Sequence, residues 1–253
     1  MSLFRDRAMR RSVGRAIHQY RMIGDGDRIA VGLSGGKDSL TLMWVLHERL
    51  SRIPIHYSLV AIHIDLGFKG TPAPRIEAYC KEMGYHCEVA YTDFGTRSHS
   101  EENRENPCFL CARLRRKRLF EMADGLGCNK LALGHNMDDI IETLFLNMCY
   151  SGEISTMVPC QPFFNGKLVV IRPLAHVDEG GIDQFAQDHK FPDFANPCPT
   201  AKTSKRREIK KMLKGLYETN NKIKGNLFRS MSRIKPDYLL KPTGMEQDAT
   251  AGM

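Results

Sequence analysis

The amino-acid sequence predicts an α/β fold: a doubly wound, mainly parallel five-stranded sheet with a small basic helical module at the C-terminal end. Short apolar strands alternate with segments of helical periodicity, which is the pattern of a parallel sheet covered on both faces. A glycine-rich turn directly follows the first strand, and after Pro197 the strand pattern stops and basic helical segments begin. At 253 residues the chain is long enough to bury a substantial core.

Five segments have the short apolar character of buried strands: residues 29–33, 58–64, 87–91, 131–133 and 168–171. Between them, apolar residues recur at helical spacing in residues 40–50, 75–83, 110–126 and 138–148. The polar stretch 93–107 is longer than most loops, which suggests that it serves a site. We predict an N-terminal basic helix at 1–24, an α/β domain at 25–192, a basic helical module at 193–240 and a disordered tail at 241–253.

The net charge of +8 is concentrated near the C-terminal end. From Lys202 to Lys235 the chain has twelve Lys or Arg and two Glu, so the rest of the chain is slightly acidic. Such a module suggests a polyanionic partner, because each phosphate that it neutralises releases condensed counterions. A solvated helix face is one alternative, and an anionic membrane surface is a weaker one because the apolar face of the segment is sparse. No apolar run approaches the roughly 18 residues that a membrane crossing needs, and residues 1–23 lack a secretory-signal pattern. We expect a cytoplasmic protein with a polyanionic partner.

The most specific local pattern is the turn between the first strand and the helix at 40–50, which consists of Ser34, Gly35, Gly36, Lys37, Asp38 and Ser39. Adjacent glycines let backbone N–H groups approach an anion, and the following helix directs its positive end to the same point. The turn is not a Walker A loop, because Val31 stands where that motif has glycine and Asp38 follows the lysine. It also lacks the glycine spacing of a dinucleotide fingerprint. The turn predicts a phosphate-binding loop.

A second polar segment follows the fourth strand and contains Gly134, His135, Asn136, Asp138 and Asp139. Ligands of open α/β sheets bind at the carboxyl ends of the strands, so this segment is expected beside the phosphate loop. Paired carboxylates next to phosphates hold Mg²⁺ or fix the nucleotide. The alternative is that Asp138 and Asp139 are only the acidic first turn of a helix.

Three of the eight cysteines stand apart from the apolar segments. Cys108 and Cys111 are two residues apart before a run of arginines, and Cys198 lies between two prolines. A Cys-x-x-Cys pair at a helix start has reactive or ligating thiols. Three thiolates leave one position of a tetrahedral set open, as in an iron-sulfur cluster with one open iron; a zinc ion with His135 or His99 as fourth ligand is the alternative. The others are expected to be ordinary buried thiols: Cys80, Cys87, Cys128, Cys149 and Cys160.

Several motifs resemble a known family. The turn 34–39 resembles the Ser-Gly-Gly-x-Asp-Ser signature of the PP-loop ATP pyrophosphatases, which have an adenine nucleotide α-hydrolase-like fold. Residues 107–116, the segment 134–139 and residues 143–148 are similar, in the expected order, to the tRNA 2-thiocytidine synthetase family. The similarity covers residues 28–231 but departs after Cys198, where Pro199-Thr200-Ala201 stands in place of a further cysteine.

The resemblance implies a function and a set of site residues. It implies that ATP is cleaved between its α and β phosphates on residues 34–39, with adenosine near Ile64 and a [4Fe-4S] cluster on Cys108, Cys111 and Cys198. The C2 oxygen of a cytidine in tRNA, cytidine 32, would be adenylated and replaced by sulfur, with release of AMP and pyrophosphate. Sulfur would arrive through the cluster or as a persulfide, and the catalytic residues would be Lys37, Asp38, Cys108 and Cys111.

The same reading implies partners and leaves alternatives open. The partners are tRNA, a sulfur donor such as a cysteine desulfurase, an electron donor and a second copy of the chain. The RNA backbone is expected on the basic module, at Lys205, Arg206, Arg207, Lys210, Lys211 and Lys214. The alternatives are a PP-loop ligase or amidase that adds an amine, and a zinc-stapled RNA-binding protein.

Overall fold

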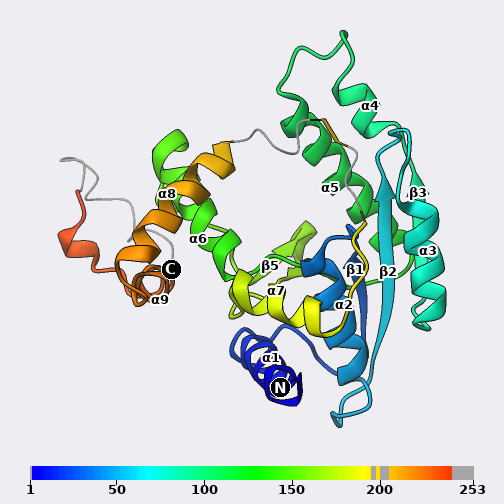
Figure 1. Ribbon diagram of the computed structural model, residues 1–253, viewed down its shortest axis with the longest axis horizontal. Coiled ribbons are helices and arrows are strands. Elements are labelled where there is room, and N and C mark those ends of the chain that lie inside the picture. The colour runs from blue at the N-terminus through cyan, green and yellow to red at the C-terminus, as the bar shows by residue number, and fades with distance from the viewer. Residues whose placement is uncertain (1, 195–197, 200–204, 241–253) are drawn as a thin grey trace, which may run out of the picture.

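The computed structural model describes residues 2–194, 198–199 and 205–240 (Figure 1). The tail predicted at 241–253 lies outside the described residues, as does part of the segment that leads into the basic module. Within the described ranges, no helix is both long and apolar enough to span a membrane.

The sheet has six strands in the order β3-β2-β1-β4-β6-β5. Their bounds are Asp27–Gly32 for β1, Tyr57–Asp65 for β2, Cys87–Tyr91 for β3, Lys130–Ala132 for β4, Cys160–Phe163 for β5 and Leu168–Ile171 for β6. All neighbours pair in parallel except β5 and β6. The predicted fold class is confirmed, but the predicted count of five strands is wrong. The additional strand β5 contains Pro162, which an edge strand tolerates because one side of it needs no donors.

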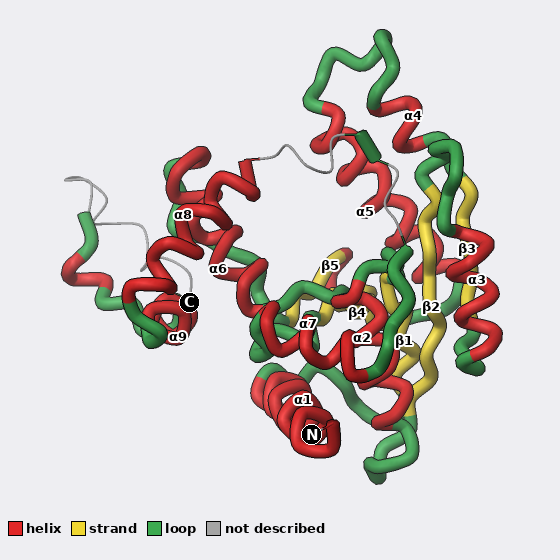
Figure 2. Tube along the Cα trace, viewed as in Figure 1, coloured by secondary structure: helices red, strands yellow, loops and turns green. Residues whose placement is uncertain are grey.

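Nine α-helices lie within the described residues (Figure 2). They are α1 at Ser2–Gln19, α2 at Lys37–Arg49, α3 at Ala73–Glu82, α4 at Phe94–Ser98, α5 at Pro107–Gly125, α6 at Met137–Leu146, α7 at Glu179–Asp188, α8 at Lys205–Thr219 and α9 at Ile223–Ser230. A π-helical turn, Asn147–Ser151, continues α6, and two short 3₁₀ turns occupy Phe164–Gly166 and Pro236–Tyr238. The short helix α4 lies in the stretch that the sequence marked as an unusually long loop.

Two apolar clusters cover the two faces of the sheet. Strand β1 shows the division, since Ile29 and Val31 lie in one cluster and Ala30 in the other. The first cluster contains buried residues of α1, α2, α3 and α7, and the second is built against α5. Successive side chains of a strand point to opposite faces, so a strand buried on both faces is apolar throughout. This explains why Ile29, Ala30 and Val31 are consecutive apolar residues in β1.

The loops that follow β1 and β4 lie next to each other. The strand order places β1 and β4 side by side, and the chain leaves β1 toward β2 on the other side. This is the topological switch point of a doubly wound sheet, where a crevice opens at the carboxyl ends of the strands. The two polar segments that the sequence marked are therefore brought together by the fold.

The helices α8 and α9 pack against α6, on the side of the molecule away from β3 (Figure 1). Ile209 and Leu213 are buried against Ile141, and Tyr217, Leu227 and Phe228 pack around them. Ile209, Leu213 and Tyr217 are spaced as one face of a helix. That face docks α8 on the α/β body beside the switch point.

Candidate nucleotide and thiol site

The phosphate loop requires glycine at position 35 for a geometric reason. Gly35 has φ of +85°, which L-residues other than glycine rarely adopt. A Cβ atom on Gly35 would lie 2.9 Å from Ile76 Cδ1 and 3.1 Å from Phe194 Cβ. Gly36 differs, since it is the N-cap residue of α2 with φ of −77° and ψ of 158°. Of the two glycines, only Gly35 therefore has a conformation that requires glycine, whereas Gly36 is an ordinary helix N-cap.

Two hydroxyl groups hold the loop in shape. The Ser34 amide donates to Ser39 Oγ at 3.1 Å, and the Gly36 amide donates to Ser34 Oγ at 3.3 Å. The Ser39 hydroxyl donates in turn to the Gly36 carbonyl oxygen at 2.9 Å. These bonds preorganise the loop ahead of α2, where the positive end of the helix favours an anion.

Asn136 joins the loop after β4 to the phosphate loop. Its side-chain oxygen accepts hydrogen bonds from the amides of Asp138 at 2.9 Å and Asp139 at 3.1 Å. Its Nδ2 donates to Asp38 Oδ1 at 2.8 Å. Gly134 lets the two loops approach, because a Cβ atom there would lie 3.1 Å from the backbone of Asp38. Burial raises the pKa of both Asp38 and Asp139 above the ordinary value of an aspartate.

His135 is held neutral and in one tautomer. Burial first, and then Arg172, Arg206 and Arg116, lower the pKa of His135 to about 3. Arg172 Nε donates to His135 Nδ1 at 3.3 Å, and an arginine only donates, so the proton of the neutral ring is on Nε2. His135 therefore presents an N–H donor. Sequence reasoning missed Arg172, which is only 6% exposed at the end of β6, and only its place just after a strand could have indicated it.

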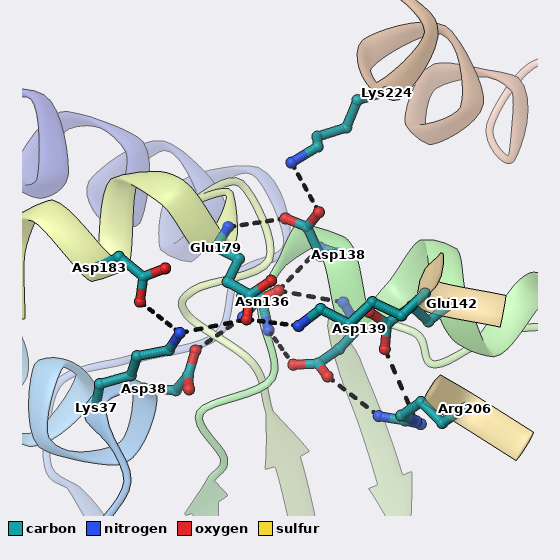
Figure 3. Close-up of polar contacts among 11 residues, drawn as sticks. Lys37, Asp38, Asn136, Asp138, Asp139, Glu142, Glu179, Asp183, Arg206 and Lys224 are labelled. Carbon is teal, nitrogen blue, oxygen red and sulfur yellow. Dashed lines mark hydrogen bonds and ion pairs between the residues drawn. The ribbon is translucent and has the colours of Figure 1, made fainter. Parts of the chain in front are cut away.

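A network of charged side chains surrounds the loop lysine (Figure 3). Lys37 Nζ lies 3.3 Å from Glu179 Oε1 and also pairs with Asp183 of α7. Three cations from α8 and α9 reach the same region. Arg206 Nη1 lies 3.1 Å from Asp139 Oδ1, Lys210 Nζ lies 2.6 Å from Glu179 Oε1, and Lys224 Nζ lies 2.7 Å from Asp138 Oδ1. Glu179, Asp183 and Lys224 were not predicted from the sequence.

A cavity of about 450 Å³ lies at the switch point. Most of the predicted nucleotide-binding residues line it: Ser34, Gly36, Asp38, Ser39, Ile64, Gly134, His135 and Asp139. The cavity lining does not include Gly35, whose role is to shape the turn, or Lys37, which points to α7. Asp138 instead lines a second cavity of about 410 Å³, which shares Asp38 and Asp139 with the first. His63 also lines the first cavity, with its Nδ1 2.8 Å from the Leu33 carbonyl oxygen.

Helix α5 contains two of the three marked thiols, Cys108 and Cys111, and contributes Arg115 and Leu119 to the lining of this cavity. Asn106 caps the helix by accepting from the amides of Cys108 at 3.0 Å and Phe109 at 3.3 Å. Arg115, one turn after Cys111, lines the cavity. Burial raises the pKa of the Cys111 thiol, Arg115 opposes this, and the nearby thiols of Cys198 and Cys108 raise it further. Cys108 and Cys198 are therefore both close enough to Cys111 to influence its ionisation.

The other cysteines correct the expectation of five buried thiols. Cys80 and Cys128 are buried, Cys87 and Cys160 are partly buried, and Cys149 is exposed on the π-helical turn. Among the residues that the structure describes, no group of three or more His, Cys, Asp or Glu side chains forms a site for a single metal ion.

Comparisons with known proteins identify the family. The PP-loop domain family matches residues 7–215. The tRNA-cytidine(32) 2-sulfurtransferase of Geobacter sulfurreducens is 41% identical over 239 residues, which cover 93% of this chain and 93% of that protein. The chain belongs to the tRNA-cytidine(32) 2-sulfurtransferase family. The member of this family from Geotalea daltonii is 42% identical over 247 residues, covering 95% of this chain and 98% of that protein. The resemblance predicted from the motifs is thus confirmed, and the chain is a sulfurtransferase of the PP-loop type.

Two solved structures resemble the fold of this family member. The U34-tRNA thiolase NcsA from Methanococcus maripaludis, solved with its [4Fe-4S] cluster, superposes with a TM-score of 0.76 at 26% identity. The match covers 92% of this chain and 79% of that one. The NH3-dependent NAD synthetase from Campylobacter jejuni has a TM-score of 0.52 at 14% identity, with 92% of each chain covered, and shares the fold alone.

Proposed function

We propose that the protein uses ATP to adenylate the C2 oxygen of a cytidine in tRNA, cytidine 32, and then replaces that oxygen with sulfur. One observation carries the proposal: a single cavity is lined both by the phosphate loop and by Arg115, one turn past Cys111 on α5. ATP activation and sulfur delivery need adjoining sites, because an adenylated base is short-lived in water. The names of the relatives support the substrate.

The nucleotide half of the site is assigned as follows. The triphosphate binds on residues 34–39, where the positive end of α2 favours an anion, and the adenosine lies against the end of β2 at Ile64. Lys37 would leave its pairs with Glu179 and Asp183 and stabilise the charge that develops on the leaving pyrophosphate. His135 donates from Nε2 to an oxygen at the reacting phosphorus, which needs a neutral ring of the tautomer that Arg172 fixes. Asp38 acts through Asn136, which ties the two loops together.

The carboxylates beside the loop would hold a divalent cation only together with the phosphates of ATP, since by themselves the described side chains form no site of three metal ligands. Asp38, Asp138 and Asp139 line one cavity, and oxygen donors of this kind are the ligands that Mg²⁺ prefers. When bound there, Mg²⁺ would neutralise charge on the phosphates.

The thiol half of the site suits a cluster. Cys108, Cys111 and Cys198 would hold a [4Fe-4S] cluster, since Cys108 and Cys198 both lie near enough to Cys111 to affect its pKa and NcsA was solved with such a cluster. A cluster held by three thiolates has one iron without a protein ligand, and it would supply a place from which sulfur reaches the base. A persulfide on Cys108 or Cys111 is the other route by which the chain delivers sulfur.

The reaction balances in two steps. The C2 oxygen attacks the α-phosphorus, the bond from that phosphorus to the pyrophosphate oxygen breaks, and pyrophosphate leaves. Sulfur at the oxidation level of sulfide then forms a bond to C2, and the bond from C2 to the oxygen breaks, so that AMP leaves with the oxygen of the base. On the persulfide route the outer sulfur attacks C2, the other thiol of the Cys108 and Cys111 pair breaks the S–S bond, and the electron donor reduces the disulfide that these two cysteines form. The base must be unstacked to reach the cavity, which favours a loop nucleotide of tRNA. The proposal includes a sulfur donor such as a cysteine desulfurase, an electron donor and a second copy of the chain.

The test is to purify the protein anaerobically, incubate it with unmodified tRNA, Mg-ATP and a sulfur donor, and digest the tRNA for mass spectrometry. We expect 2-thiocytidine that depends on ATP and is lost in Cys111→Ala. The matched control is Cys149→Ala, which removes an exposed thiol and should thiolate as the wild type does. Full thiolation by Cys111→Ala, or modification by an amine instead of sulfur, would overturn the proposal.

A further inference from the structure

The basic helix α8 has two different charged faces. Arg206 and Lys210 lie on the same side as the buried Ile209 and Leu213, which pack on α6. Lys211 and Lys214 are on the exposed side and, within the described part of the chain, pair with no carboxylate. The sequence placed all of these cations on the RNA backbone. In the structure Arg206 (Figure 3) and Lys210 instead pair with carboxylates around the phosphate loop.

Lys210 and the loop lysine, Lys37, both pair with the same oxygen atom of Glu179. Glu179 Oε1 lies 2.6 Å from Lys210 Nζ and 3.3 Å from Lys37 Nζ. The two ammonium nitrogens are therefore at most about 6 Å apart. Their mutual repulsion at that distance is offset only by an anion that lies between them. Glu179 is that anion here, and its pKa is lowered because Lys210 and Lys37 outweigh its burial.

Arg206 is placed in the same way on the other side of the cavity. Its Nη1 lies 3.1 Å from Asp139 Oδ1, its Nη2 donates to Thr143 Oγ1 at 3.1 Å, and its Nε lies 3.9 Å from Glu142 Oε2. The cavity of about 410 Å³ between these groups is lined by Asp38, Asp139, Arg206 and Lys210. Through Asp38 and Asp139 it adjoins the cavity that contains the phosphate loop.

We propose that Arg206 and Lys210 bind the β and γ phosphates of ATP, exchanging Asp139 and Glu179 for phosphate oxygens when the nucleotide enters. This inference rests on the proposed use of ATP. A triphosphate seated on the loop is a stronger anion than one carboxylate, and guanidinium and ammonium groups both bind phosphate oxygens. Lys37, Lys210 and Arg206 then surround the pyrophosphate that leaves. Helix α8 thereby joins the RNA-binding face of the protein to the nucleotide site.

The inference predicts which ligands each cation binds. Inorganic pyrophosphate, a non-hydrolysable ATP analogue and AMP are titrated calorimetrically into the full-length protein without tRNA. Arg206→Met and Lys210→Met keep the apolar stems of the side chains and should raise the dissociation constants of pyrophosphate and of the analogue by about 10- to 100-fold. The dissociation constant of AMP should change less than about twofold, because AMP lacks the phosphates concerned.

Matched controls separate this role from a structural one. Lys211→Met and Lys214→Met remove the same charge from the exposed face, and they should weaken binding of tRNA but of none of the three small ligands. Arg206→Lys retains the charge if the methionine variant fails to fold, and it should give an intermediate loss.

Pyrophosphate binding by Arg206→Met and Lys210→Met equal to that of the wild type would overturn the inference, as would an equal loss of AMP binding. Normal thiolation by such variants would leave the proposed function intact. Conversely, a wild-type protein that binds pyrophosphate through these residues but makes no thiolated tRNA would sustain the inference and overturn the proposed function.

Discussion

Replacing Gly35 with alanine tests the strained geometry of the phosphate loop. An alanine at φ of +85° costs about 1–2 kcal/mol in backbone strain. The new Cβ would also lie 2.9 Å from Ile76 Cδ1 and 3.1 Å from Phe194 Cβ, and the second of these atoms cannot swing away. Alanine restricts the unfolded chain, which offsets about 0.4–1 kcal/mol. We expect the free energy of unfolding to fall by about 1–3 kcal/mol, with ATP affinity reduced because the loop amides move.

The neighbouring glycine supplies the control. Gly36 has φ of −77°, and a Cβ atom there would meet only Ser34 Oγ, at 3.5 Å. Gly36→Ala should therefore cost about 1 kcal/mol or less, mainly because alanine caps a helix poorly. The assay is urea denaturation of both variants without ligand, followed by circular dichroism, with ATP binding measured in parallel. Equal losses of stability in the two variants would refute the reasoning.

Three further predictions concern the charged and thiol groups. Burial raises the pKa of Glu142 to about 7 from 4.5. Between these pH values the folded state binds a proton that the unfolded state has lost, so the free energy of unfolding falls as the pH rises, by about 3 kcal/mol between pH 4.5 and 8. Glu142→Gln should remove this pH dependence, which urea titrations at several pH values would measure. Arg172→Gln should raise the pKa of His135 from about 3 in an NMR titration, and an unmoved pKa would contradict the assigned contact. The double variant Cys108→Ser and Cys111→Ser should abolish iron binding but leave the affinity for an ATP analogue within about twofold of the wild type, since the phosphate loop lies on other elements. A loss of both iron binding and ATP-analogue affinity would contradict the separation of the thiol site from the nucleotide site.

Local patterns were enough to predict most of the sheet and the phosphate loop. Five strands were found because strands buried on both faces are continuous apolar runs, and the loop was found because adjacent glycines precede a helix. The edge strand β5 was missed because Pro162 and its polar neighbour break the strand pattern. The exposure of Cys149 was missed because α6 gives way to a π-helical turn, which has no local sequence signal.

The charged partners of the site were harder to predict, because they come from distant parts of the chain. Lys37 pairs with Glu179 and Asp183 of α7, and Arg172, just after β6, contacts His135 in the loop that follows the neighbouring strand β4. Such pairs follow from the packing of elements rather than from spacing within one element. Only the inward direction of Arg206 could have been found earlier, since Ile209 and Leu213 mark the buried face of α8.

The fate of the oxygen atom tests the central claim most directly. Thiolation is run in water enriched in ¹⁸O, and the AMP and 2-thiocytidine produced are quantified by mass spectrometry. Adenylation of the base predicts one AMP for each 2-thiocytidine and no ¹⁸O in AMP, because the oxygen on AMP comes from C2 of the cytidine. AMP that carries ¹⁸O would show that water attacked the α-phosphorus, and it would contradict activation of the base by adenylation.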